Sequence, residues 1–273
     1  MKNDKMVLNY HKNGSADSRK FVDFNKLKLT KGFNGERAAE RANSFMLYTA
    51  ELVKDGETQK ASDLFQNFHE YYYFPRLGFC KKSRNGKGTS PESFIEVIKL
   101  LQEKKRSDLL IRGNIFAPVL VKNYNADKSS DTLIALTLPE LSEYTALLAN
   151  IYGFPTKKIE ANYWNTSDLC WSKMQIVLAD TENSGEFMIV CPDDILTSRF
   201  EYTMANFIFK FWLIVHNESL VVEGKPKLTQ EKLREFIKEN FGSNRNFLMY
   251  IIGDMSTESL AGYLNRDFRS TQN

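Results

Sequence analysis

Apolar residues recur at helical spacing from Gly35 to Asp55, and this repeat restricts the fold more than any other feature of the sequence. They stand three, four and seven positions apart: Ala38, Ala42, Phe45, Met46, Leu52 and Val53. This spacing predicts one long amphipathic helix. The pair Asp55-Gly56 ends it, because glycine tolerates the left-handed backbone of a helix terminus. A helix with one apolar face has to pack that face against other elements.

The rest of the chain supplies both helical and strand-like segments. Ser90-Pro91 has the residues of a helix start, with a cap followed by proline at the first position. Further helices are predicted over 131–138, 139–151, 192–215, 228–240 and 247–264. Strands are predicted near 20–29, 71–80, 109–111, 117–121 and 220–222, with hairpins at 174–191 and between Trp164 and Trp171. We predict a single mixed α/β domain over 35–273, with a central mixed sheet flanked by helices, after a basic N-terminal lead over 1–34.

Composition is typical of an ordinary globular protein. The chain has 273 residues, of which 42% are hydrophobic and 26% charged, and 37 Lys and Arg against 34 Asp and Glu leave a net charge of +3. This charge is too small to indicate a nucleic-acid partner by itself. Three widely spaced cysteines indicate a reducing compartment. The start lacks an apolar segment, and the longest apolar run, Phe207–Val215, is too short to span a membrane. We therefore expect a cytoplasmic protein without a membrane partner.

A basic loop over 81–89 is the first candidate binding segment. Its cations are Lys81, Lys82, Arg84 and Lys87, and it leads directly into the predicted helix at Ser90. Glycines allow close backbone approach, and a helix N-terminus favours an anion. The segment lacks the glycine and Lys-Ser/Thr pattern of a phosphate-binding loop. It predicts a site for phosphate groups, or else an ordinary solvated loop tip.

Three tyrosines precede this loop. Aromatic faces stack on bases while nearby cations hold phosphates, so the combination favours a polynucleotide. In a strand, Tyr72 would face away from Tyr71 and Tyr73. We therefore predict that Tyr72 binds nucleic acid and that at least one of the three rings is buried.

The acidic segment 127–131 is a candidate metal site. Metal-dependent phosphodiester hydrolysis uses two or three carboxylates around a divalent cation. Asp127 and Asp131 are four residues apart, so on a helix they would share one face. We predict that both, together with Glu70, bind Mg²⁺ or Mn²⁺ and act in catalysis. In the alternative interpretation Asp127 lies in a turn and Asp131 caps the following helix.

A second acidic motif occurs at Glu223-Gly224-Lys225. A strand that ends in Glu-x-Lys forms half of the metal site in restriction-type nucleases. The motif is short, Glu103-Lys104-Lys105 matches it as well, and Gly224-Lys225-Pro226 also has the composition of a turn.

The order of these segments resembles a family of uncharacterised bacterial proteins from mobile and phage-defence gene neighbourhoods. The resemblance covers residues 43–240 and rests on short motifs: Phe68-His69-Glu70, Arg76-Leu77-Gly78-Phe79, Gly86-Lys87-Gly88, Asn125–Asp131, Leu141–Thr145, Tyr163-Trp164-Asn165, Trp171 and Phe187–Leu196.

The resemblance implies that the Asp127–Asp131 segment and the Leu-Gly loop are shared features. The family pattern has a further carboxylate shortly before Arg76-Leu77-Gly78, where this chain has tyrosines. This departure weakens the case for metal-dependent cleavage. Glu223-Gly224-Lys225 is not part of the family pattern.

Two functional hypotheses follow. In the first, the protein is a defence-type protein that binds DNA or RNA and cuts it with a divalent metal. In the second, it is a non-enzymatic adaptor or sensor subunit that binds a protein encoded by a neighbouring gene. A small-molecule enzyme is less compatible with three scattered histidines and no nucleotide-binding fingerprint.

Overall fold

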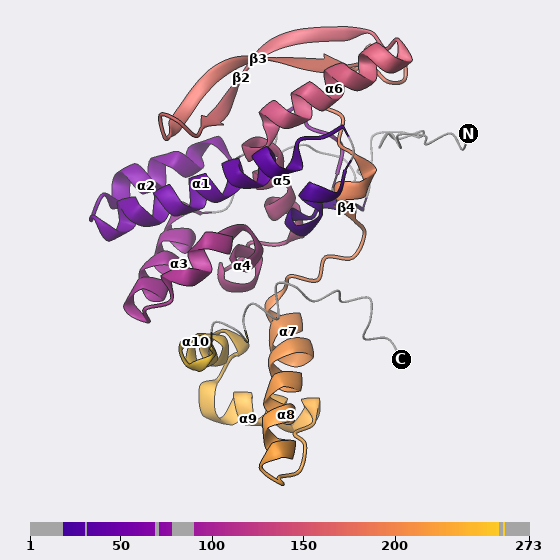
Figure 1. Cartoon of the computed structure of the whole chain (residues 1–273). Coiled ribbons are helices and arrows are strands. Elements are labelled where there is room, and N and C mark those ends of the chain that lie inside the picture. The colour runs from indigo at the N-terminus through magenta and orange to yellow at the C-terminus, as the bar shows by residue number, and fades with distance from the viewer. Residues whose placement is uncertain (1–18, 31, 69–70, 78–89, 257–258, 260–273) are drawn as a thin grey trace.

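Helix α1 (Gly35–Lys54) confirms the helix predicted from the apolar repeat. In the computed structural model, which describes residues 19–30, 32–68, 71–77, 90–256 and 259, this helix packs against most of the other N-terminal elements (Figure 1). The Asn34 side chain caps its start by accepting the Arg37 N–H, and Gly56 follows its end with a positive φ of 83°. Both boundaries therefore follow from local sequence.

Gly35 is required because another backbone segment passes very close to it. A Cβ atom at this position would lie 1.7 Å from the carbonyl oxygen of Leu27, in the 3-10 helix Phe24–Leu29. Backbone atoms cannot move aside as a flexible side chain can. Glycine thus allows the N-terminal segment to pack directly on the start of α1.

Seven further helical elements follow α1 in the described N-terminal region. Their bounds are α2 (Thr58–Leu64) with a 3-10 turn Phe65–Asn67, α3 (Pro91–Glu103), a 3-10 helix Ser107–Arg112, α4 (Gly113–Leu120), α5 (Ala126–Leu136) and α6 (Leu138–Tyr152). Ser90 and Pro91 begin α3 as predicted. Gly153 ends α6 in the left-handed conformation, with φ of 72°.

The strands form two small antiparallel sheets. One pairs β1 (Phe21–Val22) with β4 (Leu196–Thr197), and the other pairs β2 (Thr156–Asn165) with β3 (Cys170–Ala179). The mixed fold class in a single domain, with strands flanked by helices, is therefore confirmed. The predicted central mixed sheet is wrong for the described residues, where each sheet has two strands.

Helix α6 covers one edge of the β2–β3 hairpin (Figure 1). The Val177 N–H donates to the Ser142 hydroxyl of α6 at 2.8 Å. Ala179 and Met188 exchange two backbone hydrogen bonds, so the segment after the hairpin pairs with the end of β3. The predicted 174–191 hairpin is corrected accordingly, because the main partner of β3 is β2. The predicted hairpin between Trp164 and Trp171, which pair directly, is confirmed.

Four helices form the C-terminal part of the described chain. They are α7 (Met204–Asn206), which continues through a π-helical segment Phe207–Trp212 into α8 (Leu213–Val222), then α9 (Gln230–Phe241) and α10 (Asn244–Asp254). Figure 1 shows this helical group beneath the N-terminal region.

Several predicted strands are wrong. Residues 109–111 lie in a 3-10 helix, 117–121 lie mostly in α4, and 220–222 end α8. Of the strand predicted over 71–80, residues 71–77 contain a turn at 72–74 and residues 78–80 lie outside the described residues. The strand predicted over 20–29 is limited to Phe21–Val22. All these apolar runs are short, and a short apolar run does not distinguish a strand from a buried helix. Among the described helices, none combines the length and the apolar character needed to cross a bilayer.

Candidate functional site

Asp127 and Asp131 both lie on α5. The Asn125 side chain caps this helix by accepting the Lys128 N–H at 3.1 Å, so Asp127 falls in the first turn and Asp131 one turn later. Both are partly buried. The alternative in which Asp131 caps a helix is therefore wrong, and the two carboxylates share a helix face as their spacing requires.

Among the described residues, no third metal ligand lies beside Asp127 and Asp131. Within them, no group of three or more His, Cys, Asp or Glu side chains could hold a metal ion. Glu140 and Glu143, the next acids along the chain, are bonded instead to Arg37, at 2.8 Å from Glu140. Glu70, the third predicted ligand, lies outside the described residues. Two carboxylates would hold Mg²⁺ only with water and phosphate oxygens completing its shell.

The three tyrosines in the turn at residues 71–74 differ in exposure to solvent. Tyr73 is 3% exposed, and the Tyr71 ring stacks on it with 5.1 Å between centroids. Burial raises the pKa of both phenols, so they stay neutral. The Ile189 N–H donates to the Tyr73 carbonyl at 2.9 Å and fixes the turn. Tyr72 is 61% exposed, whereas the burial of Tyr73 confirms that at least one of the three rings is buried.

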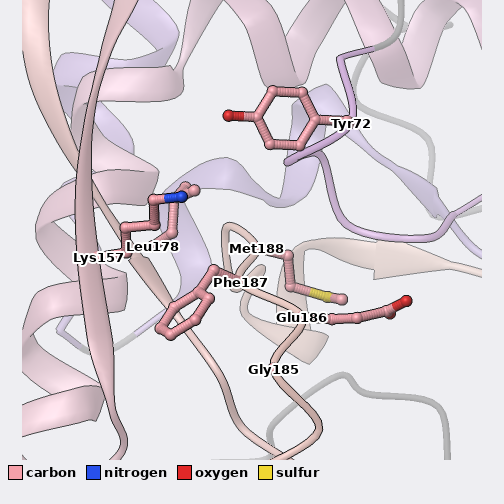
Figure 2. Close-up of a pocket in the computed structure, with 7 residues that line it drawn as sticks. All are labelled: Tyr72, Lys157, Leu178, Gly185, Glu186, Phe187 and Met188. Atoms are coloured by element: carbon pink, nitrogen blue, oxygen red, sulfur yellow. The ribbon is translucent and has the colours of Figure 1, made fainter.

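Tyr72 lines a surface pocket of about 200 Å³ (Figure 2). The other lining residues come from β2, β3 and the segment that follows β3: Lys157, Leu178, Gly185, Glu186, Phe187 and Met188. Figure 2 shows the Tyr72 ring on one side of the pocket and the side chains of Lys157 and Phe187 on the other. The pocket lining thus combines an exposed aromatic ring, a cation and the apolar side chains of Leu178, Phe187 and Met188.

Lys157 and Leu178 meet in the pocket because of the hairpin register. They are directly opposite each other in the β2–β3 ladder, so their side chains lie on the same face. Phe187 precedes Met188, which pairs with the last residue of β3. The pocket thus forms where the base of the hairpin meets the segment that leaves it.

Asp180 holds the loop that forms the end of the pocket. Its carboxylate accepts the backbone N–H groups of Gly185 at 2.7 Å, Ser184 at 3.0 Å and Glu182 at 3.3 Å. Burial alone would raise the pKa of Asp180, but these hydrogen bonds outweigh it and lower the pKa. The loop is therefore built around a buried, ionised carboxylate.

The Arg76 guanidinium forms an ion pair with Glu186 at the rim of this pocket. The pair neutralises the carboxylate, so Lys157 contributes the uncompensated charge among the described lining residues. The predicted phosphate-binding residues Lys81, Lys82, Arg84 and Lys87 lie outside the described residues.

The Glu223-Gly224-Lys225 motif is not a strand end. It follows the last turn of α8, and the Lys225 ammonium donates to the Glu223 carboxylate at 2.7 Å on the surface. The lysine and the acid neutralise each other in a turn, as the alternative interpretation of the sequence expected.

Sequence reasoning missed Lys157, Phe187 and Met188 as pocket residues. A signal for Lys157 was present, because extending the register of the Trp164–Trp171 pair back along both strands reaches Lys157 opposite Leu178. The sequence pattern over 156–165 does not by itself predict a strand, so the sequence alone does not place Lys157 opposite Leu178. No local pattern predicted that the Tyr72 turn would lie beside the hairpin.

Comparison with known protein families identifies a match. The profile of a family described as Domain of unknown function (DUF8370) matches residues 11–203, which include the pocket, α5 and both sheets. No curated protein and no solved structure matches the chain. The profile spans more than half of the sequence, and the chain therefore belongs to the DUF8370 family.

Proposed function

We propose that this protein is a cytoplasmic nucleic-acid-binding protein of a bacterial defence system, and that the Tyr72 pocket takes one base of a single strand. The observation that supports this function is the exposed Tyr72 ring at the same pocket as the Lys157 cation, which has no salt-bridge partner among the described residues. A base stacks on an aromatic face whatever its identity, and the adjacent phosphate is held by a cation.

The size of the pocket favours part of a polymer over a free small molecule. Pockets for small molecules usually measure about 300–1,000 Å³. The volume here is about 200 Å³, which suits a flat ring or one side chain. Recognition of a single projecting group is typical of proteins that bind unpaired bases.

A binding titration tests this proposal. Fluorescence anisotropy of a labelled oligothymidylate and a labelled oligouridylate is measured with the full chain over a range of salt concentrations. Tyr72→Ala should weaken binding by about 5- to 150-fold, because one stacked base contributes about 1–3 kcal/mol. Tyr250→Ala is the matched control, since Tyr250 is 56% exposed on α10 and does not line the pocket.

The contribution of Lys157 is tested by the salt dependence. Lys157→Gln should weaken binding for every base sequence and reduce the slope of log affinity against log salt by about one. The same change is expected for each of Lys81, Lys82, Arg84 and Lys87 if the loop also contacts phosphates. Equal affinities for wild type, Tyr72→Ala and Lys157→Gln would remove the pocket from the proposal.

Metal-dependent cleavage by Asp127, Asp131 and Glu70 stays a prediction within this proposal. Asp131→Asn should abolish any cleavage in Mg²⁺ or Mn²⁺ and leave oligonucleotide binding intact. Glu143→Gln is the control, because Glu143 is bonded to Arg37. If Asp131→Asn leaves the cutting rate unchanged, these acids are not the catalytic site.

A further inference from the structure

Among the described residues, the outer edge of β2 is not paired with another strand. In an antiparallel ladder, the N–H and C=O groups of alternate residues point to opposite sides of the strand. Val177 donates to Ser142, and Ala179 pairs with Met188, so both point away from β2. Their partners in the register, Lys158 and Thr156, therefore point away from β3.

The same alternation places the backbone groups of Glu160 and Trp164 on the outer edge. The Trp164 carbonyl is bonded there to Arg41 at 2.6 Å, which agrees with this assignment. For Thr156, Lys158 and Glu160, the described residues provide no hydrogen-bond partner for the outward backbone groups. All three residues are exposed. Half of β2 thus presents a template for another strand.

The charge along this edge is positive. Within the described part of the chain, Lys157 and Lys158 have no salt-bridge partner, and Glu160 is paired with Lys173 at 2.7 Å. The two lysines are adjacent, so one side chain lies on each face of the strand. An added strand would therefore meet a cation on both faces.

We propose that the outer edge of β2 binds an extended acidic segment of a partner protein by strand addition. Main-chain hydrogen bonds to Thr156, Lys158 and Glu160 would hold the segment, and two consecutive acidic residues would pair with Lys157 and Lys158. Alternating backbone donors and acceptors fit a peptide better than a sugar-phosphate chain, which has no matching row of groups.

A second copy of this chain fits the edge less well. Antiparallel pairing of two copies centred on Lys158 would place the two Lys158 side chains directly opposite each other, and like charges in that position are destabilising. Pairing centred on Ile159 would place Lys158 opposite Glu160, whose carboxylate is already paired with Lys173. Lysine on an edge strand commonly prevents self-pairing. The charge that repels a second copy attracts an acidic strand. The proposal shares Lys157 with the Tyr72 pocket, whereas Lys158 does not line that pocket.

The experiment uses a labelled octapeptide of valine and threonine with two central glutamates, capped at both ends, and measures its anisotropy with the full chain. We expect saturable binding, and a peptide with two central lysines should bind at least about 10-fold more weakly. Lys158→Ala should weaken binding by about 1.5- to 5-fold through the lost charge. Lys158→Pro, which also removes the outward N–H, should weaken it by about a further 5-fold.

The Lys158 N–H points away from β3, so proline at this position removes no hydrogen bond of the β2–β3 ladder. Proline is tolerated at such positions of an edge strand. If this variant does not fold, the peptide supplies an independent measurement. N-methylation of every second peptide amide should abolish binding when the methylated amides face β2. Methylation of the other set of amides, which face away from β2, should have little effect.

Four results would overturn the proposal: no saturation at millimolar peptide, equal binding of the lysine peptide, no effect of N-methylation in either register, or a wild-type dimer that Lys158→Pro converts to monomer. Loss of peptide binding in Tyr72→Ala would also overturn it, because the peptide would then occupy the pocket. Failure of oligonucleotide binding with retained peptide binding would reject only the nucleic-acid function.

Discussion

The region matched by the family and the C-terminal helices are stabilised by different interactions. The family match ends at Thr203, whose side chain caps α7. Buried polar and charged side chains lie only before this point in the described chain, between Arg41 and Asp180. The C-terminal helices bury an aromatic core that includes Phe207, Phe211 and Phe247.

The buried charges of the matched region join three elements. Arg41 of α1 contacts Glu140 of α6 at 2.9 Å and the Trp164 carbonyl of β2 at 2.6 Å. Glu140 also accepts from Arg37. Charged hydrogen bonds require defined directions, so this network fixes how the hairpin sits on the helices.

The C-terminal helices present apolar side chains to solvent instead. Val222 is 88% exposed, Tyr250 is 56% exposed and Phe236 is 46% exposed. Two arginines connect the regions: Arg106 donates to the Ile252 carbonyl near the end of α10 at 3.0 Å, and Arg245 donates to the Leu120 carbonyl at 2.6 Å. A single substitution should therefore have larger effects in the matched region, where the hydrogen bonds of buried charges are directional, than on the surfaces of the C-terminal helices.

The largest effect is expected for Glu140→Gln. Removing the charge leaves Arg41 buried without its carboxylate, and breaking a buried pair costs about 3–5 kcal/mol. The control is Glu143→Gln, whose exposed pair with Arg37 contributes about 0–1 kcal/mol. Both are measured by urea unfolding. Equal losses in the two variants would show that burial of the network does not distinguish the regions.

Arg106→Gln should have the next largest effect. It leaves buried carbonyls at the end of α10 without a donor, at a cost of about 1–3 kcal/mol. The loss of stability should appear mainly in α9 and α10, because Arg106 donates to a carbonyl of α10. Hydrogen exchange is the measurement, with amide protection in α1 as the internal reference. An equal loss of amide protection in α1 and α10 would contradict this prediction, because the C-terminal helices would then not be stabilised separately from the matched region.

The sequence predicted the elements that carry local boundary signals. Helix α1 has a long apolar repeat and ends at Asp55-Gly56, and α3 begins at Ser90-Pro91, as expected from capping chemistry. The hairpin tip at Trp164 and Trp171 was also predicted. The short apolar runs at 109–111, 117–121 and 220–222 lack such signals and lie wholly or mostly in helices, because so short a run does not distinguish a strand from a helix.

The candidate site was less accessible from sequence. Tyr72 was identified by type, but its pocket needs β2, β3 and the segment after β3, which are distant in sequence. Asp127 and Asp131 share a helix face as their spacing indicated, whereas the ion pairs of Glu140 with Arg37 and Arg41 depend on packing of α1 against α6. Spacing determines neighbours within an element, and it does not determine which elements meet.

Asp180→Asn tests the loop beside the pocket and should have an intermediate effect that depends on pH. The folded-state pKa of Asp180 is lowered, so its stabilising contribution is present above the unfolded pKa of about 3.9 and is lost as the pH falls through the folded value. The variant should lose roughly 1–3 kcal/mol at pH 7, where the carboxylate hydrogen bonds are intact. Urea midpoints at pH 7, 5, 4 and 3 should converge for the two proteins below about pH 4. A constant difference over this range would mean that the carboxylate charge does not hold the loop.

Glu223→Gln should have the smallest effect and tests the C-terminal surface directly. The hydrogen bond from Lys225 lowers the pKa of Glu223, but the pair is exposed and bridges residues two apart in one turn. Solvent screens such a pair, so the urea midpoint should not change measurably. If the protein cuts nucleic acid, Glu223→Gln should cut at the wild-type rate, since this acid is neutralised locally and lies outside the matched region. A loss of cleavage in this variant would instead indicate that the catalytic metal site lies in the C-terminal helices and not in the family-matched region.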